Sequence, residues 1–126
     1  IFIEQRKILF NSYKDILSNL PIKLLEIPEE VDSSHHLAII RLKKNNKQYQ
    51  RNIFKIMRRN NIGVQIHYIP VHLQPYYKKL GFREGLFPKS EEYARDVISL
   101  PIYPGLQSSD IRYISSTLAS ALSNEH

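Results

Sequence analysis

Several features are missing from this sequence of 126 residues, and each absence excludes a class of protein. It has no cysteine, which excludes disulfides, thiolate metal ligands and thiol nucleophiles. The longest purely aliphatic run, residues 37–40, is far shorter than the roughly 20 residues that a membrane span needs, so no membrane segment is expected. Residues 1–3 run directly into four polar or charged residues, unlike a signal peptide, and we expect a cytoplasmic location.

What the sequence does contain is typical of one soluble globular domain. Hydrophobic residues make up 42% and charged residues 24% of the chain. The net charge is +6, which suits a phosphorylated ligand, an anionic membrane face or a nucleic acid, or is simply a basic surface. Aromatic residues lie near basic pairs, but no zinc finger, glycine-rich RNA motif or helix-turn-helix pattern is present. A nucleic-acid partner is therefore not expected.

The order of apolar patterns predicts an α/β fold of the α+β two-layer kind, a small sheet with helices packed on it. Apolar residues at helical spacing predict a helix over about residues 3–20, which Pro21 ends, and the core then spans about 22–126. Alternating or continuous apolar runs predict strands, and proline, asparagine and serine mark the helix ends. The expected strands are 22–27, 36–42, 64–68 and 98–100, and the expected later helices are 46–60, 74–80, 91–97 and one from 108 onward.

The densest group of chemically useful side chains lies between Gly63 and Tyr77, with the sequence GVQIHYIPVHLQPYY. Its prolines stiffen the chain, and a stiff loop that leaves a strand can hold histidine and tyrosine side chains toward a ligand. The alternative is structural: His67 and Tyr68 finish a strand and fill the edge of the core. In that strand Val64, Ile66 and Tyr68 share one face and Gln65 and His67 the other, and the pattern alone leaves both interpretations open.

Other candidate sites have weaker support. His67 and His72 lie five residues apart across a proline, without an acidic residue between them, so we expect no metal site. General acid–base work by one histidine is chemically possible, but no nucleophile triad or pair of carboxylates is evident, so the pattern gives it little support. Residues 98–106 are interpreted as a buried strand and a rigid turn, whose polar side chains are Ser99 and Tyr103. Glu91 and Glu92 are interpreted as a solvated helix face. His35 and His36 are interpreted as surface or edge residues.

Three motifs in order resemble the C-terminal part of the DegT/DnrJ/EryC1/StrS sugar aminotransferases. They are residues 63–77, residues 87–91 (FPKSE) and residues 98–104 (ISLPIYP). The resemblance covers essentially the whole chain. The sequence HYIPVHLQPYY, followed by SLPIYP, is most similar to the family members of pseudaminic acid synthesis. Those enzymes make UDP-4-amino-4,6-dideoxy-N-acetyl-β-L-altrosamine.

The resemblance implies a small C-terminal domain of a fold-type I aminotransferase that depends on pyridoxal 5'-phosphate (PLP). It implies one domain over residues 1–126, with the large PLP-binding domain upstream of Ile1. In that family the Schiff-base lysine lies in the large domain, and no segment here resembles the motif around it. The segment alone is therefore expected to carry no catalytic residue, no cofactor-binding residue and no activity, because a Schiff-base lysine needs a cofactor cradle.

The resemblance also implies a substrate and partners for the whole enzyme. The whole enzyme is then expected to aminate a UDP-linked 4-keto-6-deoxy sugar, with glutamate as the amino donor, and to be a homodimer. The residues placed at the sugar nucleotide are His67, Tyr68, Pro70, His72, Gln74 and Tyr76. The alternative is a separate, non-catalytic binding or interaction module, with a basic nucleic-acid binder less favoured.

Overall fold

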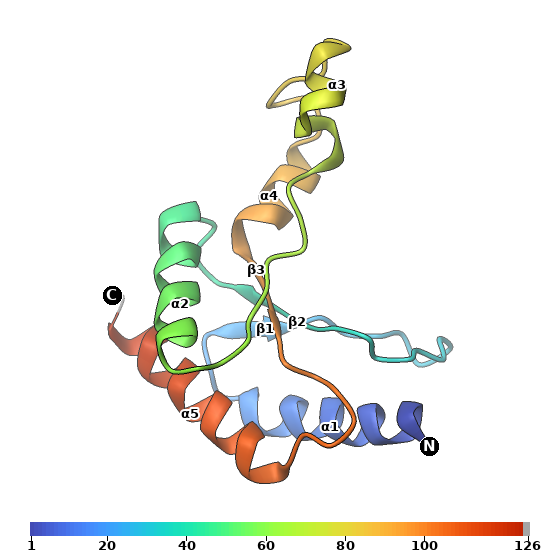
Figure 1. The fold of residues 1–126 in the computed structure, drawn as a ribbon, viewed down its shortest axis with the longest axis vertical. Coiled ribbons are helices and arrows are strands. Elements are labelled where there is room, and N and C mark those ends of the chain that lie inside the picture. The colour runs from blue at the N-terminus through green and yellow to red at the C-terminus, as the bar shows by residue number, and fades with distance from the viewer. Residues whose placement is uncertain (125–126) are drawn as a thin grey trace.

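The structure is a computed structural model and describes residues 1–124 (Figure 1). The predicted domain extends to residue 126, so its last two residues lie outside the described part. Five α-helices, one 3-10 turn and three strands follow one another along this part, and the predicted α/β fold is confirmed. The elements are α1 (Phe2–Leu17), β1 (Ile22–Leu24), β2 (Ala38–Leu42), α2 (Lys47–Arg59), η1 (Val71–Leu73), α3 (Pro75–Lys79), α4 (Pro88–Asp96), β3 (Val97–Leu100) and α5 (Ser108–Asn124).

The sheet is antiparallel, with the strands in the order β1-β2-β3. The central strand β2 pairs Ile40 with Leu24 of β1 and with Ile98 of β3. All four side chains of β3 are buried, as expected for a strand that is covered on both sides. Strand β3 is therefore the most enclosed part of the sheet.

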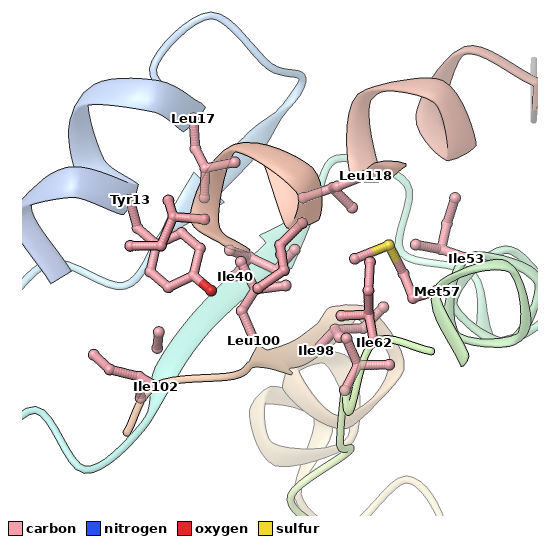
Figure 2. Close-up of a cluster of buried hydrophobic side chains, with 14 of the residues drawn as sticks. Tyr13, Leu17, Ile40, Ile53, Met57, Ile62, Ile98, Leu100, Ile102 and Leu118 are labelled. Atoms are coloured by element: carbon pink, nitrogen blue, oxygen red, sulfur yellow. The ribbon is translucent and has the colours of Figure 1, made fainter. Parts of the chain in front are cut away.

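The core lies where α1, α2 and α5 meet the sheet (Figure 2). Its largest fully buried side chains include Tyr13, Ile40, Met57 and Leu118, which come from four different elements. The Tyr13 hydroxyl donates a 2.7 Å hydrogen bond to the carbonyl oxygen of Pro101, which ties α1 to the turn after β3. Burial raises the pKa of the Tyr13 phenol, so the group remains a neutral donor.

The sequence signals for helix ends are largely confirmed. Asn46 caps α2: its side-chain oxygen accepts hydrogen bonds from the backbone N–H groups of Gln48 and Tyr49. Helix α1 ends at Leu17, three residues before the predicted end. No helix among residues 1–124 combines the length and the apolar content needed to cross a membrane.

A long excursion leaves the rest of the domain between Gln65 and Asp96, and we call residues 66–95 the arm and the remainder the body. Figure 1 shows the arm as a projection with α3 near its tip and α4 leading back to β3. Every buried apolar side chain in the described chain belongs to the body. The buried side chains of the arm are both polar, His72 and Glu91.

The predicted strand over residues 64–68 is wrong. Only Gln65 pairs with the sheet, through an isolated antiparallel bridge to Ser99. Its N–H bonds the Ser99 carbonyl at 3.1 Å, and the Ser99 N–H bonds its carbonyl at 2.8 Å. Beyond this bridge β3 continues through Ile98 and Val97, but residues 66–68 turn into the arm and do not pair with it. Val64 is fully buried as expected, but Tyr68 is 71% exposed, which excludes it from the edge of the core.

Candidate functional site

His67 lies at the root of the arm, two residues after the bridge to β3. Its Nδ1 lies 2.9 Å from the Oγ of Ser99, whose own side chain is buried. The other ring nitrogen, Nε2, has no hydrogen-bond partner among residues 1–124 and is not fully buried. The sheet therefore holds one edge of this imidazole and leaves the opposite edge free for an external group.

The segment that follows His67 presents apolar and aromatic side chains to solvent. Tyr68 packs edge-on against the His67 ring, with the ring centroids 4.7 Å apart, and the peptide bond between these residues is cis. Ile69 and Val71 are also exposed. Pro70 is half-buried and precedes η1. This surface can cover an apolar or planar part of a ligand, and His67 adds a polar group at its edge.

Gln74 and Tyr76 lie further out on the arm. Gln74 is half-buried, and its side-chain amide lies 3.4 Å from the carbonyl of Ile69, which draws the loop into a compact turn. Tyr76 is 67% exposed at the start of α3 and contacts the ring of Tyr77 edge-on. The structure thus brings the six predicted residues onto one segment, with Tyr68 and Tyr76 as its most exposed members.

His72 is enclosed within the arm, unlike His67. Its Nε2 lies 2.9 Å from Oε1 of Glu91, and both side chains are less than 10% exposed. The Glu91 carboxylate also accepts the backbone N–H groups of Gly85, at 2.8 Å, and of Phe87. The hydrogen bond with His72, and then those from the backbone, lower the pKa of Glu91. Because an ionised carboxylate only accepts, Nε2 of His72 is the donor.

The interpretation of Glu91 as part of a solvated helix face is wrong. The chain between α3 and α4 folds back over the first turn of α4, so Glu91 faces the loop rather than water. Its neighbour Glu92 remains partly exposed and contacts Arg41. Position along a helix alone does not reveal which residue a distant loop will cover.

A continuous series of aromatic ring contacts extends from the buried His72–Glu91 pair. Phe87 packs edge-on against His72 with centroids 4.8 Å apart, and Phe82 stacks on Phe87 at 6.3 Å. Tyr77 then contacts Phe82 edge-on. These rings stay partly exposed, so the arm is organised by ring contacts and one polar cluster rather than by a closed apolar core.

The base of the arm is fixed by polar contacts with the body. Arg41 of β2 forms two hydrogen bonds with the Asp96 carboxylate, at 2.6 and 3.0 Å. Asn45 donates to the same carboxylate. The buried Gln50 side chain of α2 donates to the carbonyls of Ala94 and Val97, so the end of α4 is held from two sides.

The segment from His67 to Tyr76 is a ridge rather than a pocket. Two hollows of about 850 and 430 Å³ lie on the body, and neither includes a residue of the arm. In the part of the chain that the structure describes, no three His, Asp or Glu side chains come together as metal ligands do.

Two residues that support the candidate site were not identified from the sequence. The sequence pattern indicates a structural role for Ser99 and a solvated position for Glu91, yet each bonds one of the two histidines. Ser99 is 32 residues from His67, and Glu91 is 19 residues from His72. The partial signal was their placement in the two other motifs, residues 98–104 and 87–91.

The small antiparallel sheet, its helices and the projecting arm define a class, because the same arrangement forms about a third of solved sugar aminotransferase structures. Spr1654 of Streptococcus pneumoniae, an assigned sugar aminotransferase solved in its pyridoxamine phosphate (PMP) form, matches with a TM-score of 0.94 and 26% identity over 98% of this chain and 32% of its own. Helicobacter pylori PseC, an aminotransferase of pseudaminic acid biosynthesis, shares the fold with a TM-score of 0.88 at 21% identity, over 98% of this chain and 33% of its own.

The chain belongs to the DegT/DnrJ/EryC1/StrS aminotransferase family, whose model matches residues 1–119. The erythromycin biosynthesis sensory transduction protein EryC1 of Saccharopolyspora erythraea is 37% identical over 118 residues, which cover 90% of this chain and 30% of that protein. The chain therefore spans about a third of the length of the relatives that it matches.

Proposed function

We propose that this chain is the C-terminal small domain of a PLP-dependent sugar aminotransferase, and that the arm forms one wall of its sugar-nucleotide site. The observation that carries the proposal is the exposed ridge from His67 to Tyr76, held rigidly at the sheet and within the arm, in a chain of this family. The substrate that we propose is a UDP-linked 4-keto-6-deoxy sugar of the pseudaminic acid type, because the sequence of residues 67–77 resembles the enzymes of that pathway. Glutamate as donor, a homodimer and a cytoplasmic location belong to the same proposal.

Each of the six residues has a role that its environment supports. The free Nε2 of His67 provides a polar contact for a diphosphate or sugar hydroxyl. Tyr68 and Tyr76 present exposed rings and hydroxyls, and Pro70 shapes the turn between them. Gln74 offers an amide, while His72 shapes the ridge from within through Glu91. Direct contact of His72 with the ligand stays a prediction.

The residues described here do not fit PLP as a bound cofactor. Nine of the ten lysines are exposed, and the remaining one, Lys7, is half-buried and paired with Glu4 and Asp32 on the surface. None of these lysines is buried, whereas a Schiff-base lysine needs a cradle that encloses the cofactor. We therefore place the cofactor and the proton-transfer chemistry in the upstream domain, and give this chain the work of binding and orienting the sugar nucleotide.

The proposal is tested on the full-length enzyme with steady-state and half-reaction kinetics. His67→Ala and Tyr68→Ala should each raise the KM for the UDP-4-keto sugar about 10-fold, because each removes a contact to the sugar nucleotide. The half-reaction with glutamate should stay unchanged. Mass spectrometry of the products from UDP-linked and dTDP-linked 4-keto sugars tests the proposed nucleotide.

Two matched variants control for general damage. His36→Ala removes an exposed histidine from the loop between β1 and β2, and Tyr113→Ala removes a half-exposed tyrosine from α5. Both should leave the sugar-nucleotide KM unchanged. Unaltered sugar-nucleotide kinetics in both His67→Ala and Tyr68→Ala would remove the ridge from the substrate site. Turnover of the dTDP sugar alone would contradict the UDP proposal.

A further inference from the structure

Ser99 stands out because it is a buried polar residue with a hydroxyl aimed at the candidate site. It is 5% exposed in the middle of β3, where apolar side chains occupy the other three positions. A buried hydroxyl needs a hydrogen-bond partner, because leaving it unpaired costs free energy. Its partner is Nδ1 of His67, at 2.9 Å.

The backbone around Ser99 is fixed on both sides. On one side it pairs with Ile39 of β2, and on the other it exchanges two backbone hydrogen bonds with Gln65. Ser99 therefore lies at the last point where the body holds both segments that lead into the arm. His67, two residues beyond Gln65, is the first arm side chain to bond back to the body.

We propose that Ser99 is a positioning residue, which sets the orientation of the His67 imidazole so that Nε2 faces the sugar nucleotide. This inference rests on the proposed function of the arm. A serine hydroxyl can donate to an unprotonated Nδ1 or accept from a protonated one. It therefore holds the ring in either state of protonation, whereas a carbonyl or carboxylate would require a proton on Nδ1.

The orientation matters because an imidazole on a loop can rotate about two side-chain torsions. A ring that must be ordered when the ligand binds loses rotamer freedom at that moment, whereas a ring already held does not. Loss of the hydroxyl should therefore weaken binding of the sugar nucleotide without altering chemistry elsewhere. The loss of one neutral hydrogen bond corresponds to about 2- to 10-fold in affinity.

The test is a double-mutant cycle in the full-length enzyme, with His67→Ala, Ser99→Ala and the double variant. Ser99→Ala should raise the KM for the UDP-4-keto sugar about 2- to 10-fold and leave the glutamate half-reaction unchanged. In the His67→Ala background it should have no further effect, because Ser99 acts through that ring. An effect of the same size in both backgrounds would overturn the inference, since it would show that Ser99 acts through the strand.

Further variants separate the hydroxyl from packing. Ser99→Cys is close in size but a weak hydrogen-bonding group, and it should behave like Ser99→Ala. Ser99→Thr keeps the hydroxyl and should have the wild-type KM if its thermal unfolding matches wild type. Gln65→Ala keeps the backbone bridge and should change nothing. Wild-type KM values in both Ser99→Ala and Ser99→Cys, with His67→Ala impaired, would overturn the inference.

A second readout does not depend on the substrate. The ring signals of His67, recorded by NMR on the full-length enzyme without the sugar nucleotide, should show one fixed orientation in wild type and rotamer averaging in Ser99→Ala. If these signals respond as expected but His67→Ala leaves the sugar kinetics unchanged, the proposed function of the arm fails and the positioning by Ser99 stands. Identical ring signals in wild type and Ser99→Ala would overturn the positioning itself.

Discussion

The body and the arm of this domain are held together in different ways. The body buries apolar side chains from α1, α2, α5 and all three strands in one continuous core. The arm buries two polar side chains, His72 and Glu91, and leaves large apolar ones such as Ile69 and Leu80 more than half exposed. Burial of apolar surface is strong but unspecific, whereas a buried polar cluster is satisfied in a single arrangement. The body therefore provides stability, and the arm provides a defined shape.

The two histidines of the candidate site repeat this contrast on a smaller scale. His67 is half-buried and bonds a hydroxyl of the body, so one of its nitrogens remains available. His72 is buried and bonds a carboxylate within the arm, so it supports the loop. Residues of the same type, five positions apart, thus act at the surface and in the interior of one segment.

The largest effect should come from truncating a core residue of the body. Leu118 is fully buried in α5, and Leu118→Ala should lower the free energy of unfolding by about 2–5 kcal/mol, because it leaves a cavity. Urea denaturation followed by circular dichroism measures this. The matched change on the arm, Leu80→Ala, removes a side chain that is 60% exposed and should cost less than about 0.5 kcal/mol. Equal losses would contradict the distinction between body and arm.

A smaller effect is expected at the junction of the two regions. Asp96→Ala removes the acceptor of Arg41 and Asn45 and should lower the free energy of unfolding by about 1–3 kcal/mol, because partly buried donors lose their partner. Glu92→Gln, which alters a longer and more exposed contact of the same Arg41, should change stability little. A loss in Glu92→Gln as large as in Asp96→Ala would show that Asp96 is not the anchor.

The smallest effect on global stability, but the clearest on the arm, is expected for Glu91. Glu91→Gln should leave the unfolding midpoint of the body nearly unchanged and speed hydrogen exchange at the Gly85 and Phe87 amides, which bond its carboxylate. The exposed neighbour Glu84, changed to Gln, is the control. Unchanged exchange at both amides would refute the role of Glu91.

The same carboxylate makes the order of the arm depend on pH. The pKa of Glu91 is lowered from its ordinary value of 4.5, chiefly by the His72 hydrogen bond. Its contribution is therefore complete above pH 4.5 and is lost as the pH falls through the lowered pKa. The protection factor of the Gly85 amide, which is its exchange rate corrected for the intrinsic effect of pH, should fall over that acidic range in wild type and show no such transition in Glu91→Gln.

The parts of the fold that follow from local pattern could be predicted, and the parts that depend on distant contacts could not. Asn46 as a cap and the apolar stripe of α5 are visible within a few residues of sequence. The burial of Glu91 depends on a loop that folds back, and the role of Ser99 depends on a histidine 32 residues away. The strand expected at 64–68 has the alternation of a strand but pairs with β3 at Gln65 alone, which one segment of sequence cannot reveal.

The bridge between Gln65 and Ser99 also has a consequence for how far the length of the arm can vary. It ties the start of the arm, after Gln65, to β3 on two backbone hydrogen bonds, a few residues beyond the point where the arm returns at Asp96. The entropy of closing a loop grows only slowly with its length. A change in the length of residues 66–95 should therefore cost little folding free energy, provided that Val97 and Ile98 of β3 remain in the core.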